Sequence, residues 1–245
     1  IACDGKARSR GVRAGMSASA ALALAPQLRI CQRDASAETE ALLGVAAWAM
    51  QFTPNVALEF PDAVLLEISG SLKLFGGLAQ ILGDLREGLS TMGYTACLAV
   101  APTARAACWL ARAGTEALVM EPARADENIS VLPLAVLRCD ADTLESLQAI
   151  GAATVGDLLA LPREGLARRF GQGLLDDLDR ATGPRGNDCF GGGPASGTGQ
   201  YACALAFASG GEVLERRSDR RKPYSAAKLE SIRIRHRQVQ KEEGD

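Results

Sequence analysis

The sequence lacks the closely spaced Cys and His residues that bind structural zinc ions. Its 245 residues include one histidine, His236, and seven cysteines, no two of them spaced as Cys-x-x-Cys. Structural zinc sites need closely spaced Cys and His ligands, so we expect no metal site. An odd number of scattered cysteines is typical of reduced thiols in a cytosolic protein, and we expect a cytoplasmic location.

Long apolar runs and aromatic residues are also scarce. Aromatic residues make up 4% of the chain against 47% apolar residues, so the core must be aliphatic. The longest uncharged apolar stretch, residues 41–58, contains Gln51, Pro54 and Asn55, which predicts a helix that runs into a turn and no membrane span. We expect no signal peptide at the start of the chain. Because it begins at Ile1 instead of methionine, we expect an N-terminal piece to be absent.

Overall charge indicates no partner, because the formal net charge is -2. Its distribution is uneven: residues 213–241 hold ten Lys or Arg against three acids, and seven glycines fall within residues 183–199. We see no periodicity there and expect a tail, residues 184–245, that is disordered or out of frame. Three interpretations stay open: a basic DNA-binding arm, a reading-frame artefact, or the divergent start of a further domain.

Residues 64–113 follow an α/β pattern. A buried strand at 64–69 precedes a helix near 77–92, whose apolar residues recur at helical spacing. A second strand at 95–101 and a helix at 103–113 follow. We expect the two strands to share one sheet with the helix near 77–92 packed on it.

After Pro122 the pattern becomes helical. Thr154 is placed to cap a helix, with Asp157 at its third position in a capping-box arrangement. Two further short helices are expected at roughly 163–170 and 172–182, ended by glycines. These helices predict a separate small helical domain.

Three stretches in order resemble a known family. The first is GVRAGM at 11–16; the second is FTP at 52–54, DAVLLEISG at 62–70 and LFGG at 74–77; the third is LQAIGAATVGDLLALP at 147–162 and RRFG at 168–171. Together they resemble Y-family (UmuC/DinB-like) DNA polymerases, most closely the ImuB-type branch. The resemblance covers about residues 1–185.

The resemblance implies an α/β fold with a Y-family polymerase-like palm, small helical fingers and a helical, helix-hairpin-helix-like thumb, incomplete at both ends. It implies fingers at 1–50, palm at 51–121 and thumb at 122–183. The family's first palm strand pairs centrally and is absent here, so we expect an incomplete sheet.

The implied catalytic site is degraded. Active members hold two metal ions with carboxylates, partly through an adjacent Asp-Glu pair. That pair falls on Asp62 and Ala63, and a methyl group cannot bind a metal ion. Asp62 is therefore a vestigial carboxylate or an ordinary turn residue after Pro61. We expect no catalytic residue and no cofactor; Mg²⁺ enters only if the chain is an active polymerase.

The implied nucleotide site is reduced as well. The family's Tyr and Arg that hold the incoming triphosphate fall on Gly5 and Arg8, and its palm Lys falls on Cys108. Arg8 alone is retained, as a vestigial nucleotide-binding residue or a solvated surface charge.

The helix-hairpin-helix turn that the resemblance implies retains the residues needed to bind a DNA phosphate. In such turns, backbone N–H groups at a helix start contact a DNA phosphate. The resemblance places Gly151, Thr154, Val155 and Gly156 there. The nearby Arg168 and Arg169 add positive charge, and all six are candidate DNA-binding residues. The alternative is an ordinary two-helix corner with two solvated arginines.

The resemblance implies an accessory role in error-prone translesion synthesis, within DNA repair, the SOS response and mutagenesis. The expected partners are primer–template DNA bound without sequence preference, a sliding clamp and a separate error-prone polymerase. A nucleoid-associated location follows. Two alternatives remain: an active Y-family polymerase, or a helix-hairpin-helix DNA-binding protein with an unrelated α/β domain.

Overall fold

The computed structural model describes residues 7, 9–13, 15–28, 30, 34–183 and 201–207. It shows a mixed α/β fold built on a four-stranded antiparallel sheet, in the order β1-β2-β4-β3. The strands are β1 (Val56–Glu59), β2 (Ala63–Glu67), β3 (Cys97–Ala101) and β4 (Ala202–Ala206). Helix α2 (Ala18–Leu24) lies near the N-terminal end, and α3 (Ala35–Ala49), α4 (Leu78–Thr91) and α5 (Ala104–Arg112) lie around the sheet. The helices that follow are α6 (Pro122–Ser130), α7 (Ala141–Ala149), α8 (Val155–Leu159), α9 (Arg163–Phe170) and α10 (Gln172–Thr182). Two 3-10 turns are η1 (Ser69–Ser71) and η2 (Leu134–Leu137).

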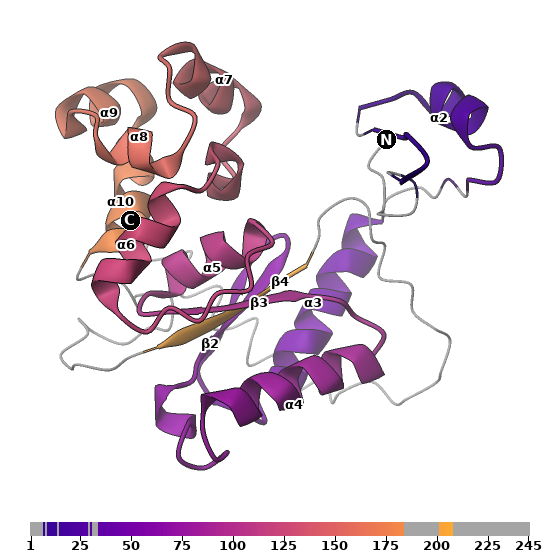
Figure 1. Ribbon diagram of the computed structural model, residues 1–245, viewed down its shortest axis with the longest axis vertical. Helices are drawn as coiled ribbons and strands as arrows, with labels where there is room; N and C mark the ends of the chain where they lie inside the picture. The colour runs from indigo at the N-terminus through magenta and orange to yellow at the C-terminus, as the bar shows by residue number, and fades with distance from the viewer. Residues whose placement is uncertain are drawn as a thin grey trace.

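The two faces of the sheet carry side chains of different size. Side chains alternate between the faces of a strand, so every second residue shares an environment. One face presents larger aliphatic groups to α3 and α4, including Val64, Leu66, Leu98 and Leu205. The other face is mainly alanine and packs under α5. Figure 1 shows α3 and α4 on one side of the sheet and α5 on the other.

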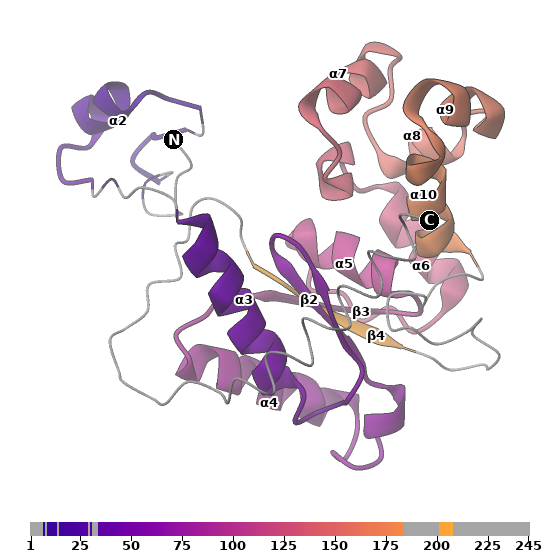
Figure 2. The same ribbon diagram turned by 180° about the vertical axis from the view of Figure 1, so that it is seen from behind.

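Small side chains let α5 lie close to the sheet. Its inner positions are themselves small, and Ala104, Ala107, Cys108 and Ala111 are buried. The apolar cluster beneath α5 continues without a break into helices α6 to α10. We call residues 122–183 the helical segment. Figure 2 shows it on the side of α5 away from α3 and α4, with α2 set apart at the N-terminal end.

The packing of α3 on α4 depends on one glycine. A Cβ placed on Gly88 would lie 2.1 Å from Cζ2 of Trp48. The Trp48 ring therefore rests directly on the backbone of α4, and it meets Phe52 edge-on with ring centroids 5.3 Å apart. Among the glycines of α4, Gly83 has open space at the same position.

Several sequence predictions are confirmed. The strands expected at 64–69 and 95–101 share one sheet, and α4 packs on it. The helices expected at 163–170 and 172–182 are α9 and α10. Thr154 and Asp157 form the expected capping box at the start of α8. Local signals carried these predictions: apolar periodicity, glycine stops and a side-chain cap.

The prediction of an incomplete sheet is wrong for the described residues. β4 occupies the place between β2 and β3 and pairs with both. It comes from residues 202–206, inside the tail for which we expected no regular structure. The strand reads ACALA and is buried on both faces, so it shows no alternation of polar and apolar residues. The remainder of the predicted tail lies outside the described residues.

One other expectation needs correction. Residues 56–59 were expected to end a helix and form a turn, whereas they form strand β1 and pair with β2. The buried residues of α3 pack on the sheet, and the fingers-like segment at 1–50 stays a prediction. Within the part of the chain that the structure describes, no helix has the length and apolarity needed to cross a membrane.

Candidate functional site

The turn between β1 and β2 presents two acidic side chains. Glu59 ends β1, and Asp62 immediately precedes β2. Asp62 is only 4% exposed, and its backbone oxygen accepts a hydrogen bond of 2.8 Å from the N–H of Phe207, just after β4. The turn is therefore fixed by the sheet, and the Asp62 carboxylate lies in a site largely removed from water.

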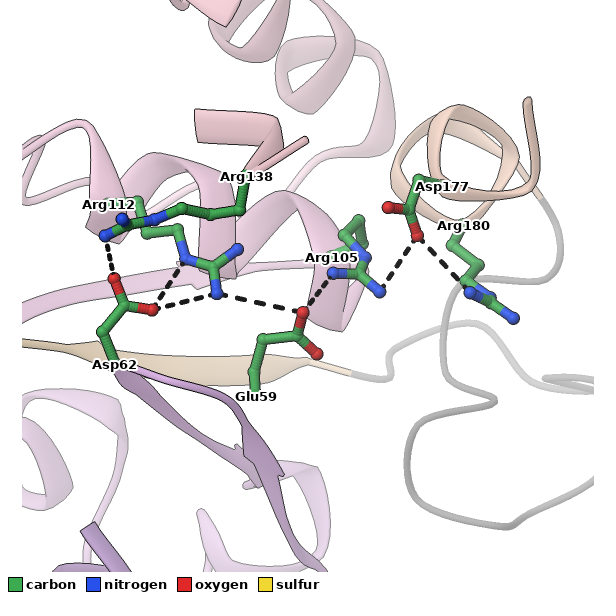
Figure 3. A network of polar contacts seen from close by, with 7 residues as sticks. All are labelled: Glu59, Asp62, Arg105, Arg112, Arg138, Asp177 and Arg180. Carbon is green, nitrogen blue, oxygen red and sulfur yellow. Dashed lines mark hydrogen bonds and ion pairs between the residues drawn. The ribbon is translucent and has the colours of Figure 1, made fainter. Parts of the chain in front are cut away.

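Two arginines pair with Asp62. Arg112, at the end of α5, donates from Nε and Nη2 to Oδ1 at 3.2 and 3.0 Å. Arg138, which follows η2, contacts Oδ2 through Nη2. Figure 3 shows the two guanidinium groups converging on this carboxylate from different elements. Each oxygen of Asp62 thus has a charged donor.

A second set of ion pairs begins at Glu59. Its Oε1 accepts from Nη1 of Arg105 at 2.6 Å, and Nη2 of Arg105 lies 3.0 Å from Oδ1 of Asp177 in α10. Arg180 also reaches Asp177, at 3.4 Å (Figure 3). Burial raises the pKa of the Asp177 carboxyl above its ordinary value, although Arg105 opposes the shift.

The charges of this network do not suit a divalent cation. Three carboxylates, on Glu59, Asp62 and Asp177, face four guanidinium groups, so the cluster carries a net charge of +1 (+4 from arginines, −3 from acids). Mg²⁺ needs several free oxygen ligands, mostly carboxylates and water. Among the described residues, no group of three or more His, Cys, Asp or Glu is placed to hold a metal ion.

The other predicted catalytic positions are unsuited to that chemistry. Ala63 is fully buried in the alanine face beneath α5. Cys108, at the position of the family's lysine, is also fully buried, and burial raises the pKa of its thiol to about 12. Gly5 and Arg8, the predicted nucleotide-binding positions, lie outside the described residues.

The predicted helix-hairpin-helix turn joins α7 to α8. Gly151 has a φ of 88°, which lets the chain reverse after α7. The backbone N–H groups of Ala153 and Thr154 both donate to Oδ2 of Asp157 at 2.8 Å. The N–H of Val155 donates to the oxygen of Leu132 at 2.9 Å. Of these donors, the N–H groups of Thr154 and Val155 were predicted to contact a DNA phosphate, and both already have acceptors within the protein.

Arg168 and Arg169 lie apart from that turn, in the last turn of α9. Both are exposed, and Arg169 stacks over the ring of Phe170 at 5.4 Å. Among the described residues, neither forms a salt bridge with a carboxylate. By contrast, Arg163 at the start of α9 pairs with Asp179 at 2.7 Å. Of the predicted DNA-binding residues, Arg168 and Arg169 therefore carry positive charge that no carboxylate of the described residues neutralises.

Sequence reasoning missed the arginines of the buried network. A signal was present: Arg105 and Arg112 are seven residues apart in an otherwise apolar stretch, which places them on the same side of a helix. Arg138, which follows η2, has no comparable local signal. Its αL backbone, with φ 57° and ψ 29°, is not encoded by a glycine and depends on its tertiary contacts.

Comparison with known proteins bears on this site. Residues 1–112 match the model of the impB/mucB/samB family. Over 173 residues, 71% of the chain, the sequence is 39% identical to Protein ImuB of Caulobacter vibrioides. Residues 1–112 therefore resemble the impB/mucB/samB family. The resemblance to the Y family and its ImuB-type branch is confirmed.

More distant relatives are polymerases by name. DNA polymerase IV of Yersinia pestis is 29% identical over 174 residues, 68% of the chain, and DNA polymerase IV of Yersinia pseudotuberculosis matches to the same extent. The matches cover 38% of the ImuB relative and 48% of the polymerase IV relatives, so the chain spans less than half of each.

The family match divides the buried network. It ends at Arg112, so Glu59, Asp62, Arg105 and Arg112 all lie in the impB/mucB/samB portion. Arg138, Asp177 and Arg180 lie beyond it, in the helical segment. The ion pairs therefore join this family portion to the chain that follows it.

Proposed function

We propose that this chain is a DNA-binding accessory protein of error-prone translesion synthesis that does not itself polymerise DNA. One observation carries the proposal: both oxygens of Asp62 are paired with guanidinium groups, where a polymerase of this family needs a carboxylate free to hold metal. Ala63 supplies no second ligand. The positive groups that neutralise Asp62 also repel a divalent cation.

In this proposal the sheet with α3, α4 and α5 serves as a palm, the N-terminal residues around α2 as fingers, and the helical segment as a thumb. DNA contact is assigned to the α9 end, through Arg168 and Arg169, because arginine pairs well with phosphate. The helical segment holds ten acids against six arginines, so its positive charge is local and its DNA affinity is modest.

The proposal extends to partners and place of action. Similarity to the Caulobacter ImuB protein supports a role beside a separate error-prone polymerase and a sliding clamp, at damaged primer–template DNA on the nucleoid. The competing function is template-directed synthesis past lesions, which the name of the Yersinia relatives favours.

A paired assay tests the two functions. DNA binding is measured by fluorescence anisotropy with several primer–templates, and primer extension is measured on the same DNA, undamaged or with an abasic site, with Mg²⁺ or Mn²⁺. We expect binding that is independent of sequence and no extension, while an active Y-family polymerase extends under the same conditions. Template-dependent extension that Asp62→Asn abolishes would establish the polymerase instead. Absence of any DNA binding would overturn both.

A further inference from the structure

The buried network connects parts of the chain that are distant in sequence. Glu59 and Asp62 come from the β1–β2 turn, Arg105 and Arg112 from α5, and the remaining members from the helical segment. The network crosses from the sheet side to the helical segment at two separate places: Asp62 with Arg138, and Arg105 with Asp177 (Figure 3).

These contacts are largely shielded from water at the sheet side. The side chains of Arg112, Asp62 and Arg105 are 3%, 4% and 10% exposed. Removing one partner of a buried ion pair leaves an uncompensated charge, which is far more costly than losing a surface pair. Arginine also fixes direction, because its planar fork must meet the carboxylate in a defined geometry. The network therefore favours one orientation over others that bury similar apolar area.

The helical-segment side is held in a specific conformation. Among the described residues, Arg138 is the one residue other than glycine with a positive φ. Such a backbone conformation persists where the surrounding contacts determine it. An uncharged bond acts in parallel: Oγ1 of Thr103, before α5, donates to the oxygen of Ala181 in α10 at 2.9 Å.

We propose that these ion pairs form an ionic clamp, made of Glu59, Asp62, Arg105, Arg112, Arg138 and Asp177, that fixes the orientation of the helical segment on the α5 side of the sheet. The carboxylate that the resemblance assigns to metal binding serves here as an attachment point for Arg138. The clamp and a metal at Asp62 exclude each other. This inference goes beyond the proposed function, because the clamp acts whether or not the protein binds DNA.

The clamp predicts local release when it is broken. In Arg138→Met, Asp62 keeps Arg112 as a partner, so the sheet stays folded while one attachment point is lost. Adding Asp177→Asn removes the second. Hydrogen–deuterium exchange of the full chain is followed by mass spectrometry for peptides covering η2, α10 and α4. The matched control is Arg163→Met, which breaks an exposed pair inside the helical segment.

We expect exchange in η2 and α10 to rise at least about tenfold in the double variant and less in Arg138→Met, with α4 unchanged. Arg138→Lys, which keeps the charge but not the fork, should fall between Arg138→Met and the parent. Arg163→Met should match the parent throughout. Should Arg138→Met leave η2 and α10 at parental exchange, or raise exchange in α4 equally, the clamp is wrong. Apolar packing alone would then orient the helical segment.

Discussion

Asp62 and Arg112 form a side-on pair in which Nε and Nη2 of the arginine, at 3.2 and 3.0 Å, both donate to Oδ1 of the carboxylate. Their side chains are 4% and 3% exposed. A carboxylate and a guanidinium this deeply buried each depend on the other for neutralisation. The residue that resembles a metal ligand has thus become part of the protein's interior.

Removing the Asp62 carboxylate should destabilise the fold. Asp62→Ala removes a carboxylate that Arg138 contacts and, among the described residues, leaves the buried Arg112 with a contact to Glu59 at 3.9 Å. We expect the free energy of unfolding in urea to fall by about 3 kcal/mol or more. Asp179→Ala, which breaks a more exposed pair, should cost no more than about 1 kcal/mol. Equal losses in the two variants would contradict the view that Asp62 is a buried counter-ion.

Restoring the missing family glutamate should not restore a metal site. Ala63 is fully buried and pairs with Ala206 of β4, while Arg112 and Arg138 keep Asp62 occupied. We expect Mg²⁺ to leave the melting temperature of Ala63→Glu unchanged and primer extension to stay absent. Ala63→Gln, of the same size but uncharged, is the control. A rise in melting temperature with Mg²⁺ in the Glu variant alone would show that the arginines can be displaced.

The reactivity of the Cys203 thiol should show whether strand β4 is inserted in the sheet. Cys203 is fully buried in β4, and burial raises the pKa of its thiol to about 12, so the thiol is essentially un-ionised at pH 8. Burial also raises the pKa of the half-buried Cys139 thiol, but iodoacetamide should modify Cys139 of the native protein faster than Cys203, as peptide mass spectrometry would show. In urea both should react. Comparable rates in the native protein would mean that residues 202–206 are not inserted in the sheet.

Two glycines of α4 should respond in opposite ways to alanine. Gly88→Ala places a methyl group against the Trp48 ring, and we expect a loss of about 1–3 kcal/mol in the free energy of unfolding. At Gly83, where space is open, alanine should stabilise the helix by about 0.5–1 kcal/mol. Thermal or urea unfolding measures the stability of both variants. A stabilising Gly88→Ala would argue against the α3–α4 contact.

Arg168 and Arg169 should account for part of the salt dependence of DNA binding. Each arginine that neutralises a phosphate contributes about 0.9 to the slope of log affinity against log salt concentration. Replacing both with alanine should therefore reduce the slope by about 2 and weaken binding to all sequences alike. Arg86→Ala, on α4 and paired with Glu116, should leave the slope unchanged. Selective weakening for one sequence would indicate base contacts.

Local features of the fold could be predicted from the sequence. The periodic leucines of α4, the glycines that end helices and the Thr154–Asp157 cap all act within a few residues, so the pattern is visible in the chain. β4 could not be found in this way. A short strand buried on both faces has no polar alternation, and its identity depends on pairing with β2 and β3, which are far away in sequence.

The site was predictable only in part. Resemblance drew attention to Asp62 and to Ala63 in place of the family's glutamate, but the partners of Asp62 come from α5 and from the residue after η2. Their meeting depends on how the helical segment packs, which no local pattern encodes. The α7–α8 turn shows the same limit: Asp157 was expected as a cap, yet its second hydrogen bond, to the N–H of Ala153, adds a carboxylate to a predicted phosphate site. The backbone N–H groups of Ala153 and Thr154 hold the pKa of the Asp157 carboxyl below its ordinary value.

The position of β4 also orders events during synthesis. Ala63 pairs with Ala206, so the sheet cannot close until the ribosome has released the chain beyond the helical segment. The residues of helices α6 to α10 are synthesised before β4, and until β4 is released no strand separates β2 from β3. Contacts between such distant residues slow folding and leave strand edges open in the meantime. A stalled or shortened chain would expose those edges, and aggregation of nascent protein would be the visible result.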